Sequence, residues 1–381
     1  MRVLVVTNDL PPRLGGIQNY VDQLCRGLTA AGDEVTVYAS AFAGDATWDA
    51  QAPFRVVRDR SSVLLPTPRV LRRTLRLIEQ TQAEVVIFGA AFPLALMGPR
   101  LKKKSGRPFI AFTHGLEVSA VRAPGGAHLL RRIGRSASAI TFVSSFCDDS
   151  LRAAFGAGPE YALLAPAVDP QVFHRAVDGS LIRDRHGLST APVVVCVSRL
   201  VERKGQDQLI MALSEVRKAV PEASLLIVGS GPYEATLRQL ASDHGVDQHV
   251  VFAGAATEDE LPAHYAAGDV FAMPCRERKR GLEVEAFGIV FIQAQAVGRP
   301  VLAGNIGGVP SALSPNKTGL LVDGSNSAHI TEALISLLED ADTRKQMGAD
   351  AAEFVRTGFT WEGRTRELRD LLNRAMSPEG Q

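Results

Sequence analysis

The stretch Arg2-Val-Leu-Val-Val-Thr7, followed by Asn-Asp-Leu-Pro-Pro-Arg-Leu-Gly15-Gly16, decides the fold of this 381-residue chain. Its opening run is apolar on both faces and rich in valine, which is typical of a strand buried inside a parallel sheet. A loop with two adjacent glycines comes next, and residues Asn19 to Ala31 then repeat apolar side chains at helical spacing. Together these segments predict the strand, turn and helix that open a doubly wound α/β domain.

The alternation of short apolar strands and helices continues along the chain and then starts again. Further strands of the first series are predicted at 34–39, 85–88, 109–113 and 139–143. The second series has predicted strands at 192–198, 224–229, 249–253, 270–273 and 300–304, and predicted helices at 206–219 and 233–244. A final helix is predicted at 361–376.

The length also favours two domains, because 381 residues exceed what one hydrophobic core usually holds. We expect an α/β protein with two Rossmann-like, doubly wound domains that face a central cleft. The expected domains are 1–170 and 171–357, with a linker near 166–177, and the segment 358–381 is expected to cross back to the first domain. Ligands of such domains bind at the carboxyl ends of the strands, so residues there must decide the function.

The whole chain carries a net charge of only +1, and this small charge gives no reason to expect nucleic-acid binding. The charged residues are nevertheless unevenly distributed along the chain. Residues 1–170 hold 20 Lys and Arg against 14 Asp and Glu, whereas the remainder holds 22 against 27. The basic excess gathers in three groups: Arg69, Arg72, Arg73 and Arg76; Arg100, Lys102, Lys103, Lys104 and Arg107; and Arg131, Arg132 and Arg135. Such groups are either solvated helix faces or a surface for anionic lipid headgroups, where each cation contributes about 1 kcal/mol.

Composition excludes several other classes of protein. Apolar residues make up 46% and charged residues 22%, as in folded globular proteins. No apolar stretch reaches the roughly eighteen residues of a membrane span, and the first strand is too short for a signal peptide. The four cysteines lack paired spacing and fit buried thiols of a reduced cytoplasm. We therefore expect a cytoplasmic protein, with peripheral contact at the inner face of the cell membrane as the role of the basic groups.

Three groups of residues at predicted strand ends can carry chemistry. In the first, Gly15 and Gly16 permit close backbone approach before a helix whose free N–H groups attract an anion, and a plain tight turn is the alternative explanation. The spacing is not G-x-G-x-x-G, which disfavours a dinucleotide site. In the second, Arg199 and Lys204 follow a strand and provide the forked donor and the point charge that a diphosphate needs. A solvated charge run is the alternative.

The third group is Gly281-Leu-Glu-Val-Glu285-Ala-Phe-Gly-Ile289-Val-Phe-Ile-Gln293. Here Glu285 precedes a Phe-Gly turn, and a helix is predicted to start near Ile289. This arrangement would present one carboxylate and several N–H donors to a sugar and its phosphate. Asp340-Ala-Asp342 lies in a helical region away from strand ends and is interpreted as an exposed turn, so no metal site is predicted.

These residues carry a resemblance to a known family. The segments that match are T-N-D-x-P-P-R-x-G-G-I-Q at 7–18, L-P-T-P at 65–68, F-G-A-A-x-P-L-A-L-M at 88–97, T-H-G-x-E-V at 113–118, S-R-L-V-x-R-K-G-Q-D at 198–207, L-L-I-V-G-S-G-x-Y-E at 225–234 and F-A-M-P at 271–274. The chain resembles the retaining glycosyltransferases of family 4, which have the GT-B fold. It is most similar to the actinobacterial GDP-mannose-dependent phosphatidyl-inositol mannosyltransferases.

The resemblance implies transfer of a hexose, α-mannose from GDP-mannose, to a lipid-linked inositol mannoside or related polyol, without a metal or other cofactor. The first domain would take the acceptor and the second the nucleotide-sugar. The implied catalytic residues are His114, Arg199, Lys204 and Glu285. The implied donor-binding residues are Gly15, Gly16, Arg199, Lys204, Glu285, Phe287, Gly288, Ile289 and Gln293, with the 254–258 loop beside the base. Without the resemblance, His114 would more often be interpreted as a structural histidine.

Two positions depart from the family pattern. Gln293 stands where the family has a glutamate that bonds the ribose hydroxyls, and an amide loses the charge-assisted part of those bonds, about 1 kcal/mol. Ser311 likewise replaces a frequent glutamate. These departures leave two alternatives open: a family 4 transferase that uses another nucleotide-sugar on a soluble natural product, and a catalytically degenerate nucleotide-sugar-binding protein.

Overall fold

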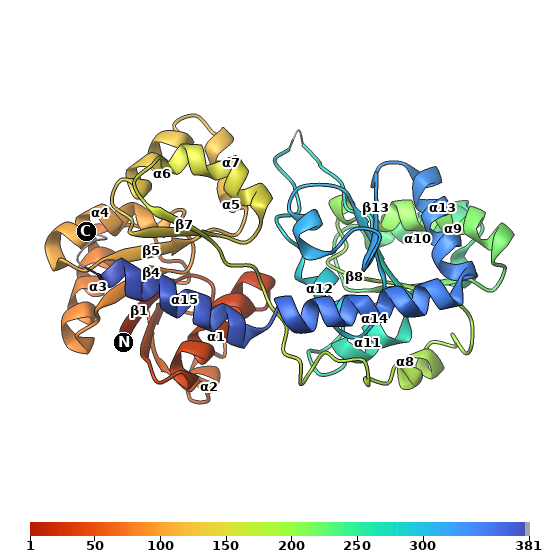
Figure 1. Ribbon diagram of the computed structural model, residues 1–381, viewed down its shortest axis with the longest axis horizontal. Helices are drawn as coiled ribbons and strands as arrows, with labels where there is room; N and C mark the ends of the chain where they lie inside the picture. The colour runs from red at the N-terminus through yellow and green to blue at the C-terminus, as the bar shows by residue number, and fades with distance from the viewer. Residues whose placement is uncertain (280, 378–381) are drawn as a thin grey trace. The chain divides into compact units, whose positions relative to one another are not determined.

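The computed structural model describes residues 1–279 and 281–377, which form two compact units (Figure 1). The first unit comprises Met1–Pro166 together with the helix that begins at Trp361, and the second comprises Ala167–Thr360. The boundaries expected at 170 and 357 lie within a few residues of these positions. Each unit is an α/β domain built on one parallel sheet, so the α/β class and the two Rossmann-like sheets are confirmed.

The first unit has a parallel sheet of seven strands within the described residues, in the order β3-β2-β1-β4-β5-β6-β7. Its strands are β1 (Arg2–Thr7), β2 (Glu34–Ala39), β3 (Arg55–Arg58), β4 (Val85–Phe88), β5 (Phe109–Phe112), β6 (Ala139–Phe142) and β7 (Glu160–Leu163). Its helices are α1 (Gly16–Ala30), α2 (Asp45–Asp49), α3 (Pro68–Thr81), α4 (Gly98–Ser105), α5 (Leu116–Arg122), α6 (Gly126–Gly134), α7 (Ser145–Phe155) and α15 (Trp361–Met376), with a 3₁₀ turn η1 (Leu94–Met97).

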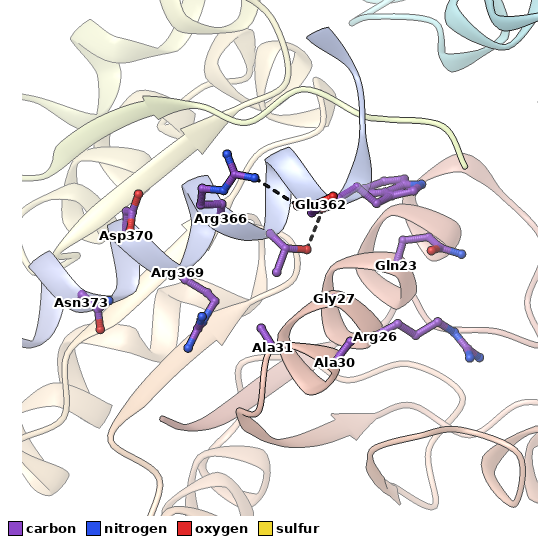
Figure 2. Close-up of a pocket in the computed structure, with 12 residues that line it drawn as sticks. Gln23, Arg26, Gly27, Ala30, Ala31, Glu362, Arg366, Arg369, Asp370 and Asn373 are labelled. Carbon is purple, nitrogen blue, oxygen red and sulfur yellow. Dashed lines mark hydrogen bonds and ion pairs between the residues drawn. The ribbon is translucent and has the colours of Figure 1, made fainter. Parts of the chain in front are cut away.

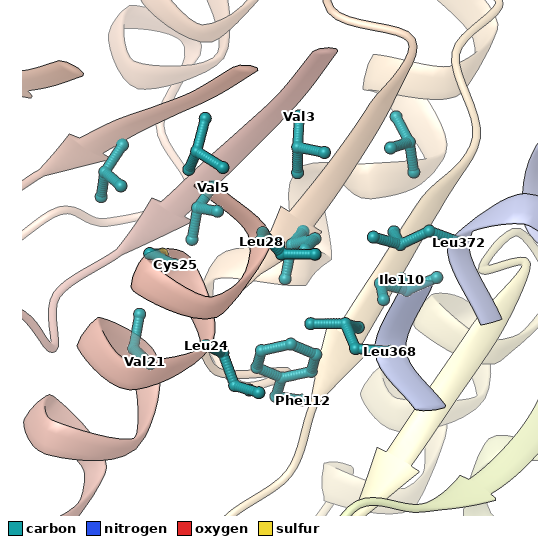
Figure 3. Close-up of a cluster of buried hydrophobic side chains, with 14 of the residues drawn as sticks. Val3, Val5, Val21, Leu24, Cys25, Leu28, Ile110, Phe112, Leu368 and Leu372 are labelled. Atoms are coloured by element: carbon teal, nitrogen blue, oxygen red, sulfur yellow. The ribbon is translucent and has the colours of Figure 1, made fainter. Parts of the chain in front are cut away.

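Helices α1 and α15 cover one face of this sheet and complete its core (Figure 3). Val3 and Val5 of β1 point toward α1, where Leu24 and Leu28 are buried against them. From α15, Leu368 and Leu372 enter the same cluster beside Ile110 and Phe112, and both leucines are fully buried. The last helix is therefore part of the first unit, although nearly two hundred residues of the second unit precede it in the chain.

The second unit has a parallel sheet of six strands in its described part, in the order β10-β9-β8-β11-β12-β13. The strands are β8 (Val193–Val197), β9 (Ser224–Val228), β10 (Val250–Gly254), β11 (Val270–Met273), β12 (Val301–Gly304) and β13 (Gly319–Val322). The helices are α8 (Ser180–Arg185), α9 (Gln206–Ala219), α10 (Glu234–Asp243), α11 (Leu261–Ala267), α12 (Ile289–Ala296), α13 (Ser327–Glu339) and α14 (Ala341–Gly358), with 3₁₀ turns η2 (Glu202–Lys204), η3 (Asp247–His249) and η4 (Val309–Ala312).

Strand order reverses once in each sheet, and this reversal determines where ligands can bind. In the first unit the reversal lies between β1 and β4, and in the second it lies between β8 and β11. The loops that leave two neighbouring strands in opposite directions open a crevice at their carboxyl ends. The residues after β1, β4 and β5, and those after β8 and β11, are therefore the candidate site residues of each unit.

Three strands were not predicted from the sequence, and all are short edge strands. The residues of β3 and β7 are exposed or half-buried, and β3 begins and ends with arginine, so neither shows a continuous apolar run. Helix α1 begins at Gly16, three residues before its predicted start, because Gly15 caps it and its first turn lacks an apolar stripe. Among the described helices, none combines the length and apolar character needed to cross a bilayer.

Removing Leu368 should unfold the first unit at lower urea concentration. Both tryptophans, Trp48 and Trp361, lie in that unit, so their fluorescence reports its unfolding separately from that of the second unit. Because Leu368 is fully buried, Leu368→Ala should lower the free energy of unfolding of the first unit by about 2–5 kcal/mol.

The matched control is Leu213→Ala, which removes an equally buried leucine from α9 of the second unit. It should shift the transition seen by circular dichroism and leave the tryptophan transition in place. A tryptophan transition that moves equally in both variants would show that α15 does not belong specifically to the core of the first unit.

Candidate active site

In the first unit, three loops meet at the carboxyl ends of β1, β4 and β5. The loop after β1 leads to Gly15 and Gly16 at the start of α1, where no side chain caps the helix. A Cβ at Gly16 would meet nothing within 4 Å, so the space in front of this helix start is open. The helix start therefore presents exposed N–H groups, which favour an anion.

His114 follows β5 and is held by two neighbouring groups. Its Nε2 lies 2.7 Å from the carbonyl oxygen of Gly89, which follows β4, and its backbone N–H donates to the carboxylate of buried Glu117 at 3.1 Å. Burial lowers the pKa of His114 to about 4, against the opposing effect of the hydrogen bond to Gly89. At neutral pH the ring is therefore uncharged, Nε2–H donates to Gly89, and Nδ1 is the acceptor that remains.

In the second unit, close backbone packing places Arg199 just beyond the end of β8. A Cβ at Gly229 would lie 2.0 Å from the carbonyl oxygen of Ser198, and one at Gly231 would lie 2.3 Å from that of Leu200. Only glycine lets the loop after β9 approach this segment so closely. Arg199 itself is exposed and has no ion pair among the described residues, so its guanidinium is available to a ligand.

Glu285 lies at the centre of the site and binds two cations through one oxygen. Its Oε2 accepts hydrogen bonds of 2.7 Å from Lys204 Nζ and of 2.7 Å from Arg203 Nη1. The side chains of Lys204 and Glu285 are only 11% and 12% exposed, so the pair lies largely out of water. Burial alone would raise the pKa of Glu285, but the charges of Lys204 and Arg203 outweigh it and hold the pKa below its ordinary value.

Glycines shape the backbone around this carboxylate. Gly288 has φ +87° and a Cβ there would lie 2.5 Å from the ring of Phe291, so another residue would disturb the start of α12. Gly308 N–H donates to the carbonyl oxygen of Glu285 at 2.9 Å. The start of α12 at Ile289 has no side-chain cap, and Phe287 is buried beneath it. Backbone N–H groups are thus available next to the carboxylate.

Gln293 lies one turn into α12 and is oriented by a tyrosine. The hydroxyl of Tyr265 donates to Gln293 Oε1 at 2.8 Å, and Tyr265 is fully buried. This bond engages one lone pair of the amide oxygen and leaves the second lone pair and the NH₂ group for other partners. A glutamate at this position would instead present a carboxylate oxygen, which accepts hydrogen bonds.

The structure therefore brings together Lys204, Glu285, Gly288 and Ile289 in the second unit, and Gly89 with His114 in the first.

Sequence reasoning missed Arg203 as a partner of Glu285 and Tyr265 as a partner of Gln293. Arg203 was signalled only by its place beside Lys204, and Tyr265 lies 28 residues from its partner without a local motif. Asp207 and Arg276 were also missed; their bidentate pair, at 2.9 and 2.6 Å, ties the start of α9 to the segment after β11.

Two other sequence features have structural roles. Asp340 caps α14 by accepting from the Thr343 N–H at 2.9 Å, and Asp342 lies within that helix. Ser311 lies in η4, and its N–H donates to the carbonyl oxygen of Gly308. Within residues 1–279 and 281–377, no three His, Cys, Asp or Glu side chains are placed to hold a metal ion.

A cavity of about 620 Å³ lies away from these strand ends, between α1 and α15 (Figure 2). Its floor is formed by small residues of α1, and its rim carries arginines that are already paired. Arg26 bonds Asp22, Arg366 bonds Glu362, and Arg369 bonds Asp33. The rim therefore offers no cation without a carboxylate partner.

Comparison with known sequences identifies the two halves of the chain. The family described as "Glycosyltransferase Family 4" matches residues 14–172, and the family described as "Glycosyl transferases group 1" matches residues 180–354. The two matches fall on the first and second units, respectively.

Relatives that are 42–46% identical match over nearly the full length of this chain. The GDP-mannose-dependent alpha-(1-6)-phosphatidylinositol monomannoside mannosyltransferase of Mycobacterium tuberculosis is 46% identical over 97% of this chain and 98% of that protein. The GDP-mannose-dependent monoacylated alpha-(1-6)-phosphatidylinositol monomannoside mannosyltransferase of Corynebacterium glutamicum is 42% identical over 97% of each protein.

Solved structures share the fold at low sequence identity. Sucrose-phosphate synthase from Thermosynechococcus elongatus superimposes with a TM-score of 0.80 at 21% identity, over 98% of both chains. Anabaena HepE in complex with UDP superimposes with a TM-score of 0.82 at 19% identity, over 98% of this chain and 100% of that one. The chain therefore belongs to the family 4 glycosyltransferases and has their GT-B fold.

Proposed function

We propose that this glycosyltransferase moves α-mannose from GDP-mannose to a phosphatidylinositol mannoside, with retention of the anomeric configuration. The names of the full-length relatives support this donor and this class of acceptor. One structural observation carries the proposal: the buried Lys204–Glu285 pair lies beside the start of α12, at the strand end where a sugar diphosphate would bind. Glu285, the carboxylate that would bind the sugar, is thus in contact with Lys204, a cation that would bind the phosphates.

Positive charge at this strand end would stabilise the departing diphosphate. Arg199 has no ion pair in the described part of the chain and can bind two phosphate oxygens, while Lys204 supplies a point charge and the start of α12 supplies N–H donors. Because negative charge builds on the diphosphate as the sugar leaves, these groups bind the transition state more strongly than the ground state. We infer that they take the role that a metal ion has in other transferases.

The two oxygens of Glu285 would have different partners. Oε2 binds both cations, whereas Oε1 has no hydrogen bond within the described residues and can accept one from a sugar hydroxyl. We expect the Nδ1 atom of His114 to accept a hydrogen bond from another hydroxyl of the hexose, since Nε2 is bound to Gly89. His114 would then position the sugar as a neutral ring and not as an acid.

Retention would follow from attack on the same face as the departing phosphate. The acceptor oxygen bonds the anomeric carbon as the bond from that carbon to the phosphate oxygen breaks, and the hydroxyl proton passes to the departing phosphate. No protein nucleophile is needed in this step. The task of the protein is to hold the two substrates and to stabilise the diphosphate.

Gln293 favours one alternative, a family 4 transferase that uses another nucleotide-sugar on a soluble acceptor. Tyr265 engages one lone pair of its amide oxygen, and its NH₂ group would donate a hydrogen bond where a glutamate accepts one. A ribose hydroxyl can accept that bond through oxygen but loses its charge-assisted contact. The full-length relatives nevertheless favour GDP-mannose.

A groove in the first unit supports contact with an anionic membrane. This cavity of about 530 Å³ has apolar walls from α3 and the η1 region, including Leu71, Leu75 and Met97. The three basic groups of the sequence each contribute to its lining, through Arg72, Arg100, Lys104 and Arg132. A lipid-linked acceptor resides in a membrane, and an apolar groove with cations around it suits acyl chains below phosphate headgroups.

Glu285→Gln should abolish transfer without loss of nucleotide binding. In a radiolabelled assay with GDP-mannose and phosphatidylinositol monomannoside, wild type should form the dimannoside, and the variant should lose about 10²–10³ in kcat. GDP should bind as well or better, because Lys204 and Arg203 lose their carboxylate partner. Glu283→Gln in the same loop is the matched control, since among the described residues that side chain forms an ion pair with exposed Lys279 and with no other cation.

If the wild-type protein used another nucleotide-sugar and did not turn over GDP-mannose, that nucleotide-sugar would replace GDP-mannose as the proposed donor. Binding of every nucleotide without turnover would instead identify a degenerate binding protein. Equal activity of Glu285→Gln and wild type would remove Glu285 from the mechanism.

Gln293→Glu should tighten GDP binding about fivefold, which corresponds to about 1 kcal/mol for a charge-assisted bond to the ribose. Calorimetric titration with GDP, UDP, dTDP and ADP measures the effect. Tyr265 remains able to donate to one carboxylate oxygen, so the fold should tolerate the change. Gln171→Glu adds the same charge at an exposed site of the second unit and should leave affinity unchanged. Weaker binding of all four nucleotides to Gln293→Glu would contradict a ribose contact.

Replacing Arg72, Arg100 and Lys104 together by alanine should weaken binding to anionic vesicles on the order of a hundredfold, since each cation near the surface contributes about 1 kcal/mol. Cosedimentation with phosphatidylinositol vesicles and with neutral phosphatidylcholine vesicles measures the difference. The control replaces Lys218, Arg238 and Arg356, which are exposed cations of the second unit. Equal losses in the two triple variants would assign the effect to net charge and not to the groove.

A further inference from the structure

A second charged cavity lies at the opposite edge of the sheet of the second unit. It has a volume of about 230 Å³ and lies next to Asp269 and Pro300, which immediately precede β11 and β12. Glu285 and Lys204 instead follow the carboxyl ends of β11 and β8. Four residues of strand span about 13 Å, so this cavity is separate from the proposed donor site.

Positive charge dominates the lining of this cavity. Arg175, Arg299, Arg344 and Lys345 line it, and a single carboxylate, Asp269, accompanies them. That carboxylate is already engaged, because its Oδ2 accepts from Arg183 at 2.8 Å and from the Val193 N–H at 2.8 Å. The nearby Asp340 accepts from the N–H and hydroxyl of Thr343. Within the described residues, neither of these carboxylates forms an ion pair with any of the four cations of the lining.

Arg299 shows that this charge is incompletely satisfied. Its Nη2 donates to the carbonyl oxygen of Ala266 at 2.7 Å, but its Nε is buried with no acceptor in the described part of the chain. Burial lowers its pKa; Asp269 opposes this, and the charges of Arg183, Arg344 and Arg175 add to it. A buried donor without an acceptor costs about 1–3 kcal/mol, and an anion here would offset that cost.

The other cations are held in place without being neutralised. Arg344 donates to the carbonyl oxygens of Leu337 and Leu338, so it keeps its full charge. The side chain of Arg175 packs against Gly298, where a Cβ would lie 3.1 Å from its Cγ. Arg175 and Lys345 have no ion pair within the described residues. The eighteen-residue helix α14 begins beside them, but Asp340 caps it and Asp342 lies in its first turn, so these carboxylates offset the partial positive charge of its amino terminus.

We propose that this cavity binds a phosphate group, carried by a free phosphate compound or by a lipid headgroup. The arginines provide forked donors that match phosphate oxygens, and Lys345 adds a point charge at the rim. The small volume accommodates a phosphate or phosphomonoester and excludes a whole nucleoside diphosphate-sugar. This inference does not depend on the proposed donor or acceptor.

The test is calorimetric titration of the full chain with inorganic phosphate at constant ionic strength. Arg175→Ala/Lys345→Ala removes the two exposed cations that have no structural hydrogen bonds, and phosphate should bind to it at least about tenfold more weakly than to wild type. The control Lys218→Ala/Arg238→Ala makes the same change of net charge on other helices and should bind as wild type does. Arg199→Ala, at the donor edge of the sheet, should also keep this phosphate site.

If Arg199→Ala lost phosphate binding while Arg175→Ala/Lys345→Ala kept it, the phosphate would lie at the donor edge. That result would overturn the proposal. Absence of phosphate binding to wild type, together with unchanged binding of Arg175→Ala/Lys345→Ala to phosphatidylinositol vesicles, would also overturn it. Vesicle binding that falls in this double variant supports the proposal with a lipid headgroup as the source of the phosphate. Phosphate binding that falls while vesicle binding is unchanged supports it with a free phosphate compound.

Discussion

Parallel strands deliver all of their carboxyl ends to one edge of a sheet, and the chemistry of this protein depends on that constraint. Arg199 and Lys204 follow β8, whereas Glu285 follows β11, about eighty residues later in the chain. Lys204 and Glu285 become neighbours because β8 and β11 are adjacent at the point where strand order reverses. The same rule brings Gly89 and His114 together in the first unit, because β4 and β5 are adjacent.

Burial makes ion pairing essential in the cluster of Arg203, Lys204 and Glu285. A charge that leaves water must be paired, and Glu285 is paired with two cations through one oxygen. The arrangement leaves a net positive charge next to the start of α12, which suits a ligand that brings two phosphates. Gly229 and Gly231 allow close contacts with the backbone after β8, and Gly288 allows the ring of Phe291 to pack at the start of α12.

Much of the fold followed from the sequence because buried parallel strands have continuous apolar runs. Edge strands such as β3 and β7 lack that signal, since one face or one end meets solvent. Single candidate site residues at strand ends, such as Lys204 and Glu285, were also identifiable from their position, and the structure brings these two together. Partners such as Tyr265 and Arg276 were not, because their contacts join segments far apart in sequence and no local pattern marks such pairs.

The position of α15 has a consequence for synthesis of the protein on the ribosome. The core of the first unit needs Leu368 and Leu372, which are translated only after the whole second unit. At roughly 5–20 residues per second, the nascent first unit waits on the order of ten to forty seconds with part of its sheet uncovered. The second unit has no such dependence and can complete its core first. Translation thus reverses the usual order in which an amino-terminal domain folds ahead of its successor.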